Sequence, residues 1–181
     1  MTNRRGADAE ALRTYEALAT DPIAWLKQAE LLRRAARLSW HALAKLHGKP
    51  PALVSEERMA YIQSFMLLTA FSFENLIRGI AVANGFLFTS VLQHKGGHAL
   101  KRDLSKLAVL SDAEGNLIDR LEVYLLWAGR YLIPLKADSY VETVRKESRT
   151  WRGTDLETGD GLFDRLAENL KKAAAENTTN W

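Results

Sequence analysis

The sequence predicts an all-α fold, a bundle of about five to seven helices arranged around one central apolar helix. Apolar residues recur at helical spacing in segment after segment, and no run shows the convincing alternation that a strand requires. Prolines, glycines and capping sequences separate these segments. With 181 residues, 47% hydrophobic and 26% charged, the chain is long enough for one domain with its own core.

The composition excludes several classes of protein. Cysteine is absent, so disulfides, thiol nucleophiles and thiolate metal sites are ruled out. Arg4 and Arg5 are not followed by an apolar stretch, which argues against a secretory signal. The most apolar segment, residues 60–83, carries several polar and charged residues, so we expect it not to span a membrane. We expect a cytoplasmic protein, whose formal net charge of +3 permits an anionic ligand without requiring one.

The first half of the chain predicts an arm and two long helices. Residues 1–20 are expected to form an N-terminal arm or a short helix. Asp21 followed by Pro22 is a typical helix start, and the helix is expected to run to about Leu46. Its inward stripe has six members, Trp25, Ala29, Leu32, Ala36, Ser39 and Leu43, and four more widen it, Leu31, Ala35, Leu38 and Ala42. The prolines at 50 and 51 interrupt the chain, and the central helix is expected from Ser55 to Asn84.

The second half predicts shorter helices. One is expected from His98 to about Leu107, and a capping box of Ser111 and Glu114 opens another that runs to Tyr131. The inner face of that second helix holds Leu117, Leu121, Tyr124, Leu125 and Ala128. A further capping box lies at 139–142, residues 154–161 read as a polar link, and a last helix is expected to fade near residue 175. Residues 21–176 are therefore expected to form one domain, with 177–181 as a frayed tail.

A polar cluster interrupts the apolar central helix. Glu74, Asn75 and Arg78 fall within about one third of its circumference, at about 100° per residue. Because a buried carboxylate without a partner is costly, the cluster either forms an ion pair between Glu74 and Arg78 or lines a wet cleft.

Two other segments carry residues suited to a polar site. His98 follows two glycines and lies at a helix start, where an imidazole can carry a proton or simply cap the helix. His94 and His98 have no third partner at telling spacing, so we expect no metal and no cofactor. Near residue 127 the chain reads WAGRYLIP, which places Arg130 beside Trp127 and Tyr131 at a helix end.

In chain order these motifs resemble the HEPN superfamily of small helical bundles, which occur in bacterial toxin–antitoxin and defence systems. The motifs are Phe-Glu-Asn-Leu-Ile-Arg-Gly, Gly-His-Ala-Leu and Trp-Ala-Gly-Arg-Tyr, spread over residues 60–134. The resemblance implies site residues at Glu74, Asn75, His98, Arg130 and Tyr131, and it implies a homodimer. The family's ribonucleases place a histidine closely after an arginine. Here no histidine follows His98, so a ribonuclease site of the usual kind is not expected.

Three functions follow as hypotheses. The first is a nucleotide- or RNA-binding protein, in which Arg130, flanked by Trp127 and Tyr131, faces Glu74 and Asn75. The second is a protein–protein interaction module whose polar cluster is structural. The third is a metal-independent ribonuclease with His98 as base and Arg130 stabilising the phosphorane. The chain also has two basic stripes, each of which is either an ordinary solvated helix face or a surface that contacts RNA phosphates. One stripe consists of Arg34, Arg37, His41 and Lys45, and the other of Arg145, Arg149 and Arg152 beside Trp151.

Overall fold

The computed structural model describes residues 3–87, 99–128, 138, 141 and 151–178. These residues form long helices and no strand, which confirms the all-α prediction. The helices are α1 (Asn3–Thr20), α2 (Pro22–Ala44), α3 (Pro51–Ala83), α5 (Leu100–Leu107), α6 (Asp112–Val123) and α8 (Asp155–Thr178). A π-helical turn, η1 (Tyr124–Ala128), continues α6.

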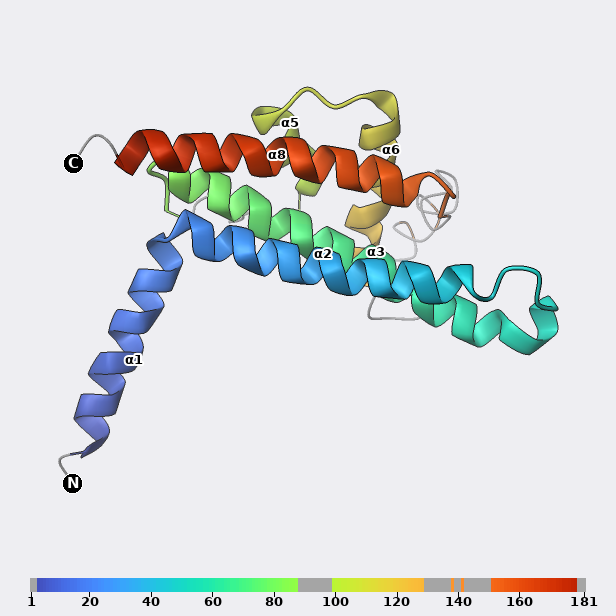
Figure 1. Ribbon diagram of the computed structural model, residues 1–181, viewed down its shortest axis with the longest axis horizontal. Coiled ribbons are helices and arrows are strands. Elements are labelled where there is room, and N and C mark those ends of the chain that lie inside the picture. Colours follow the sequence, from blue (N-terminus) through green and yellow to red (C-terminus); the bar gives the residue numbers. More distant parts are fainter. Residues whose placement is uncertain (1–2, 88–98, 129–137, 139–140, 142–150, 179–181) are drawn as a thin grey trace.

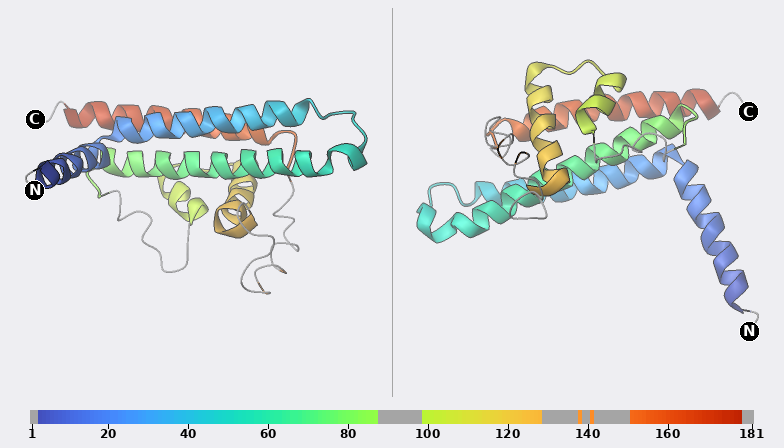
Figure 2. Two further views of the ribbon diagram at one scale, coloured as in Figure 1. Left: turned by 90° about the horizontal axis from the view of Figure 1, so that it is seen from below. Right: turned by 180° about the vertical axis from the view of Figure 1, so that it is seen from behind.

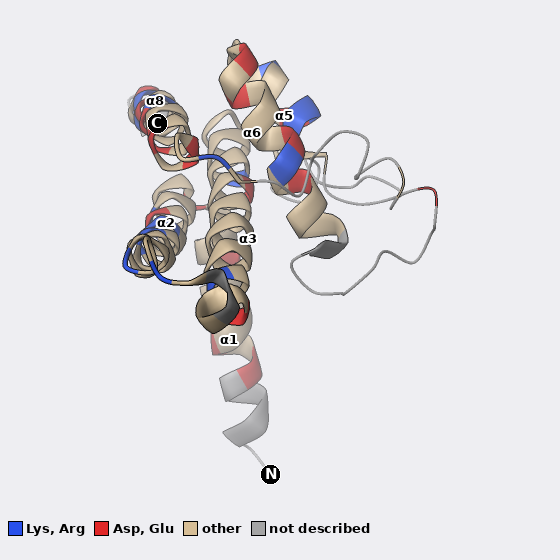
Figure 3. Cartoon of the chain, turned by 90° about the vertical axis from the view of Figure 1, so that its right-hand side faces the viewer, with Lys and Arg blue, Asp and Glu red and all other residues tan. Residues whose placement is uncertain are grey.

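The bundle is built in layers around α3. Helices α2 and α8 run alongside α3 and cover one side of it, while α5 and α6 pack against the other (Figures 1 and 3). Figure 2 shows the same arrangement edge-on, with α3 between the two groups. The buried side chains of α3 cover more than half of its circumference, at about 100° per residue, and they include Phe65, Met66, Ala70, Phe73, Leu76 and Ile77. The prediction of a central apolar helix is confirmed.

Helix α3 is long and apolar enough to cross a membrane by length and composition. The qualifying stretch, Leu53–Ala83, has a mean hydropathy of 1.4 in its most apolar window, and 61% of that window is buried inside the protein. No other described helix has this combination of length and composition. A core helix surrounded by its neighbours passes the same test.

Local capping signals in the sequence are formed as predicted. The Ser111 hydroxyl accepts from the Glu114 backbone N–H, and the Glu114 carboxylate accepts from the Ser111 backbone N–H at 2.8 Å, which completes the capping box of α6. Asp21 caps α2 by accepting from the Ile23 backbone N–H at 2.8 Å. Gly85 has a φ of 77° after the end of α3, the left-handed conformation expected there.

The elbow between α1 and α2 is held by specific contacts. The Trp25 indole N–H donates to the Ala19 carbonyl at 3.1 Å, across the bend. On the α3 side the bend rests on Gly79, where a Cβ would lie 3.0 Å from the Trp25 Cβ and 3.3 Å from the Pro22 oxygen. A glycine is therefore needed for α2 to begin this close to α3. Beyond the elbow, α1 projects away from the bundle (Figure 1).

Three expectations about the helices were wrong. Two of the four residues proposed to widen the inner stripe of α2 are exposed, Leu31 at 57% and Leu38 at 71%, whereas Ala35 and Ala42 are half-buried. Among the described helices α3 and α8 flank α2 along its length, and they cover a narrower stripe that includes Ala29, Ala36 and Leu43. The apolar period of α2 was read correctly, but its buried width was overestimated.

The expected polar link at 154–161 is instead the start of α8, and α8 continues to Thr178 rather than fading near 175. Its glycines lower helix propensity, yet tertiary packing outweighs that cost. A Cβ at Gly159 would lie 3.5 Å from Leu117, so the glycine lets α8 lie close to α6. Of the tail expected at 177–181, Asn177 and Thr178 are helical, and residues 179–181 lie outside the described residues.

The remaining expectations either agree with the structure to within a few residues or concern residues that the structure does not describe. Helix α3 begins at Pro51, in the position where proline suits a first helical turn, rather than at Ser55. The short helix begins at Leu100. Leu117, Leu121, Tyr124 and Leu125 are buried as expected on the inner face of α6 and η1. The second capping box, at 139–142, lies outside the described residues.

Candidate functional site

The polar cluster on α3 divides between the core and the surface. Glu74 is buried, with 4% of its surface exposed. Asn75 is half-buried, and its side-chain amide donates to the Phe71 carbonyl at 2.8 Å, one turn back on the same helix. Arg78 is half-buried, and its guanidinium lies 5.5 Å from the centre of the Trp25 ring. The indole therefore positions the cation at the elbow of the chain.

The simple ion pair expected within this cluster does not form. No salt bridge joins Glu74 to Arg78, although the structure describes both residues. Within the described part of the chain no carboxylate lies within salt-bridge distance of Arg78, and its buried Nε has no hydrogen-bond acceptor. Among the described residues it is therefore the Trp25 ring, and not a counter-charge, that positions the Arg78 cation. Its remaining capacity to donate hydrogen bonds is what an anionic ligand would use.

Several predicted site residues fall outside the described residues. His98, Arg130 and Tyr131 do so, as do His94 and the first part of the expected basic helix with Arg145 and Arg149. Trp127 lies in the π-helical turn η1, but its side chain is not described. The juxtaposition of these residues with Glu74 and Asn75 therefore stays a prediction.

The end of that basic segment is described at Trp151 and Arg152. Trp151 is 37% exposed, and its ring meets Trp40 of α2 edge-on at 5.5 Å with an interplanar angle of 85°. Trp40 in turn packs on Phe65 of α3, with ring centres 4.9 Å apart. This row of three rings packs the segment just before α8 against the core, so Trp151 is only partly available for stacking on a ligand.

The basic stripe of α2 is only partly available to a ligand. Arg37 donates from Nε and Nη2 to the Asp160 carboxylate of α8, at 3.1 Å and 2.6 Å from Oδ2. Arg34, His41 and Lys45 are exposed. Arg37 is therefore a structural cation, whereas the other three form a solvated basic surface.

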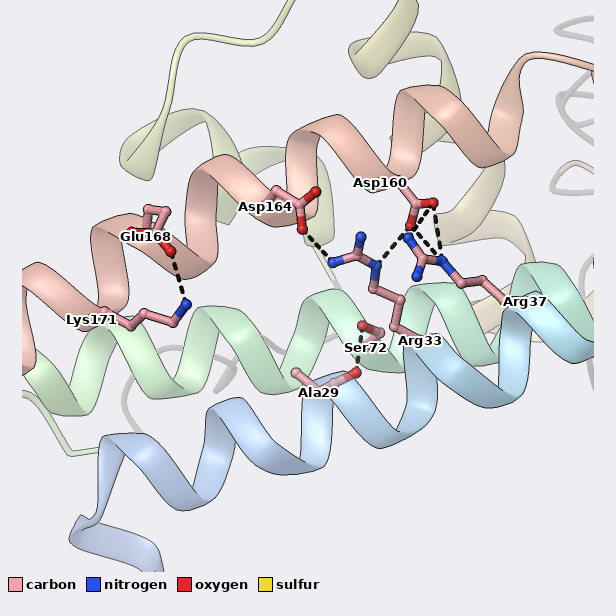
Figure 4. Close-up of polar contacts among 8 residues, drawn as sticks. All are labelled: Ala29, Arg33, Arg37, Ser72, Asp160, Asp164, Glu168 and Lys171. Carbon is pink, nitrogen blue, oxygen red and sulfur yellow. Dashed lines mark hydrogen bonds and ion pairs between the residues drawn. The ribbon is translucent and has the colours of Figure 1, made fainter.

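Sequence reasoning missed the neighbour that completes this network. Arg33 donates to Asp160 at 2.7 Å and to Asp164 at 2.5 Å (Figure 4). Its guanidinium also lies 4.4 Å from the centre of the Phe163 ring. Burial of Arg33 would lower its pKa, but the bonds to the two aspartates outweigh burial, so the pKa is raised. The sequence did contain a signal for this network: the two arginines on α2 are four residues apart, and so are the two aspartates on α8.

Two hollows lined by described residues lie away from the polar cluster on α3. One of about 20 Å³ lies beneath this ion-pair network, between α2, α3 and α8, with Ser72, Phe73 and Gly159 in its wall. It has room for about one water molecule. An open hollow of about 600 Å³ lies between α5 and the start of α6, and the one cation in its wall, Lys101, is already bound to Asp119 at 2.6 Å. Neither hollow is lined by Glu74, Asn75 or Arg78.

Glu122 is one of several carboxyl groups outside the predicted cluster whose pKa is shifted. Burial raises the pKa of Glu122 on α6, and the Lys101 backbone N–H, which donates to it at 2.8 Å, offsets this only partly. That N–H belongs to the first turn of α5, so Glu122 caps one helix from another. This capping of α5 accounts for the partly buried position of Glu122. Within the described residues no group of three or more His, Asp or Glu side chains could hold a metal ion.

Comparison with known proteins adds no family to these observations. No family model matches the sequence, and no curated protein or solved structure matches it significantly.

Proposed function

We propose that this protein is a HEPN-like helical binding module that holds a phosphate-containing ligand, a nucleotide or RNA, at the Asn75–Arg78 face of α3. The observation that carries the proposal is the position of Arg78. Its guanidinium is half-buried, stacked on Trp25, and not neutralised by a carboxylate among the described residues. A pre-positioned arginine with spare donors suits a phosphate because its planar fork matches two phosphate oxygens.

Asn75 supports the same face of the helix. It lies three residues before Arg78, so the two side chains are neighbours on the helix surface. Its amide N–H is used by the Phe71 carbonyl, which leaves its side-chain oxygen as an acceptor for a ribose hydroxyl or a base. By resemblance Arg130, Tyr131, Trp127 and His98 would complete the site, and a role in bacterial defence or in a toxin–antitoxin pair is part of the proposal.

Equilibrium binding tests the proposal directly. The probes are end-labelled single-stranded RNA and the four ribonucleoside triphosphates, each at low and moderate salt. Arg78→Ala should raise the Kd about tenfold or more, because a charged hydrogen bond contributes about 1.5–3 kcal/mol. For RNA the wild-type Kd should rise steeply with salt.

The matched control is Arg58→Ala, on the same helix but 20 residues earlier. Arg58 is also half-buried and donates to the Leu46 carbonyl at 3.4 Å. The Arg58→Ala substitution should leave the Kd unchanged. Both variants should keep their helical circular dichroism, since the stack on Trp25 contributes only about 0.5–1 kcal/mol at a partly exposed site. No binding by the wild type, or equal loss in both variants, would reject the proposal.

The ribonuclease hypothesis has a separate test. Purified protein is incubated with end-labelled RNA in the presence of a chelator, beside His98→Ala and Arg130→Ala. Cutting that disappears in both folded variants would establish catalysis without metal. Binding without cutting would leave a non-catalytic module, which the protein–protein interaction hypothesis also describes.

A further inference from the structure

The face of α3 that carries Asn75 and Arg78 also carries an aromatic ring, Phe71. All three side chains are half-buried. They are four and three residues apart in the sequence, so at about 100° per residue they lie within about 60° of the helix circumference. Phe71 and Arg78 are separated by about 10 Å along the helix axis. A ring, an amide and a cation therefore follow one another along one side of α3, and we call these three residues the α3 row.

Each member of the α3 row has a chemical group that no described residue occupies. Phe71 is only partly covered by the core, and none of the ring contacts in the described part of the chain involves it. Asn75 uses its amide N–H on the Phe71 carbonyl, at 2.8 Å, which leaves its side-chain oxygen as an acceptor. The Arg78 guanidinium lies 5.5 Å from the centre of the Trp25 ring, and its Nε has no acceptor among the described residues. The row thus offers, in order, a stacking face, a hydrogen-bond acceptor and a cationic fork.

This order of groups matches the parts of a nucleotide, in which a ribose with hydroxyl donors joins an aromatic base to an anionic phosphate. A base stacks on an aromatic ring, a ribose hydroxyl donates to an amide oxygen, and an arginine fork binds two phosphate oxygens. The residues one turn before Phe71, Leu67 and Leu68, are half-buried and uncharged. The end of the row that would receive the base is therefore apolar, and the end that would receive the phosphate is cationic.

The charges on α3 favour a free nucleotide over a strand of RNA. A strand is held by a groove in which several cations follow successive phosphates. Helix α3 contains two cations, Arg58 and Arg78, which at about 100° per residue lie about 160° apart around the helix. On the side of α3 that carries the row, the exposed carboxylate of Glu57 precedes Phe71 and would repel a phosphate. One ring and one cation suit a ligand with one base and one phosphate chain.

We propose that the α3 row binds a free nucleotide whose base stacks on Phe71, with a ribose hydroxyl donating to Asn75 and the phosphates at Arg78. The inference rests on the proposed phosphate site at Arg78, and it deepens that proposal by naming the ligand class and the residue that receives the base. Because every base has a flat π face, the row accepts all four bases.

Two ligands that share a triphosphate group separate the base contact from the phosphate contact. The probes are ATP and inorganic triphosphate, each titrated into the full chain by calorimetry. ATP should bind the wild type at least about tenfold more tightly than triphosphate, because only ATP has a base to stack. Phe71→Leu keeps an apolar side chain but loses the ring, so it should raise the Kd for ATP about tenfold and leave the Kd for triphosphate unchanged. Arg78→Ala should weaken the binding of both ligands.

The matched control is Tyr61→Leu, which removes a half-buried ring ten residues earlier on the same helix. Tyr61 lies about 80° from Phe71 around α3, and its hydroxyl donates to Glu57 at 3.1 Å. Tyr61→Leu should therefore leave both Kd values unchanged. Phe71→Tyr keeps the ring and should bind ATP with the wild-type Kd. All four variants should keep the helical circular dichroism of the wild type.

Three results would overturn the inference while leaving a phosphate site at Arg78. The first is ATP binding that Arg78→Ala weakens and Phe71→Leu does not. The second is equal affinity of the wild type for ATP and for triphosphate. The third is a short single-stranded RNA that binds far more tightly than ATP and depends on Arg78, which would make a strand the ligand. If neither ATP, triphosphate nor RNA binds the wild type, the proposed function fails as well.

Discussion

Two of the sets of ion pairs that tie helix α8 to the bundle differ in their exposure to water. At its first residue Asp155 pairs with Arg120 of α6, and the two side chains are only 3% and 5% exposed. One and a half turns later Asp160 pairs with Arg33 and Arg37 of α2, where the side chains are 16% to 41% exposed. The same chemistry therefore operates under two degrees of desolvation.

The difference lies in what each pair does when it is broken. In the exposed set, water replaces a lost partner, so the net contribution is modest. In the buried pair, loss of one partner leaves the other charge unpaired and without water to solvate it. Arg120 also donates to the Asn116 carbonyl at 3.0 Å, while its buried Nε has no acceptor in the part of the chain that the structure describes. The buried pair therefore specifies how α8 meets α6, and the exposed set steadies α8 against α2.

The largest effect is expected from Arg120→Met, which leaves Asp155 buried without its cation. The free energy of unfolding should fall by about 3–5 kcal/mol at pH 7. Burial already raises the pKa of Asp155, with the Arg152 backbone N–H and Arg120 opposing it, and removing Arg120 should raise the pKa further. A raised carboxyl pKa contributes stability below its ordinary value of 3.8 that is lost as pH rises through the raised value.

The deficit of Arg120→Met should therefore shrink toward pH 4, measured by urea unfolding at both pH values. Replacing both partners, Arg120→Met with Asp155→Leu, should recover most of the loss, since a well-packed apolar pair can match a buried ion pair. A deficit of the same size at both pH values would contradict the role given to Asp155.

A smaller effect is expected from Asp160→Asn. Loss of the charge that receives Arg33 and Arg37 should cost about 1–2 kcal/mol in low salt. High salt should reduce that cost, because partly exposed pairs are screened, whereas the deficit of Arg120→Met should hardly respond. The matched control is Asp164→Asn: Asp164 also binds Arg33 but its side chain is 66% exposed, so the change should be within about 0.5 kcal/mol. If the stability deficits of Arg120→Met and Asp160→Asn depended equally on salt, the two sets of ion pairs would not differ in their exposure to water.

The smallest effect is expected from Glu114→Gln on α6. Burial would raise the pKa of Glu114, but bonds from Arg165 and Ser111 outweigh it and lower the pKa below its ordinary value of 4.5. A lowered pKa contributes stability that is present above the ordinary value and is lost as pH falls through the lowered one. Glu114→Gln, which keeps an acceptor for the capping box, should cost about 0.5–1 kcal/mol at pH 7, a cost that disappears at low pH.

Unfolding midpoints measured across a pH series check how the stability cost of Glu114→Gln depends on pH. The cost of Arg120→Met also falls in acid, but for the opposite reason. The loss in Glu114→Gln comes from a carboxylate that the fold prefers charged, and the loss in Arg120→Met comes from one that the fold prefers neutral. A cost in Glu114→Gln that persisted in acid would assign Glu114 a packing role instead.

The candidate site illustrates the limit of sequence reasoning. The wheel position of Glu74, Asn75 and Arg78 was predictable from their spacing on one helix. The ring that holds Arg78 was not, because Trp25 lies more than fifty residues earlier and reaches α3 only through the elbow. For the same reason Asp160 could not be matched to Arg33 and Arg37 once its segment was read as a link.

The sequence by itself determined the helices, their caps and the central place of α3. Those features depend on neighbours within a few residues: Ser111 reaches Glu114, Asp21 reaches Ile23, and a helix that is apolar around most of its circumference must be covered by other helices. Only the tertiary structure decided which apolar stripe of α2 stays exposed, where α8 begins and which arginine meets which carboxylate. These outcomes depend on how much surface the neighbouring helices cover and how much water they exclude, and both are set by packing between segments far apart in the chain.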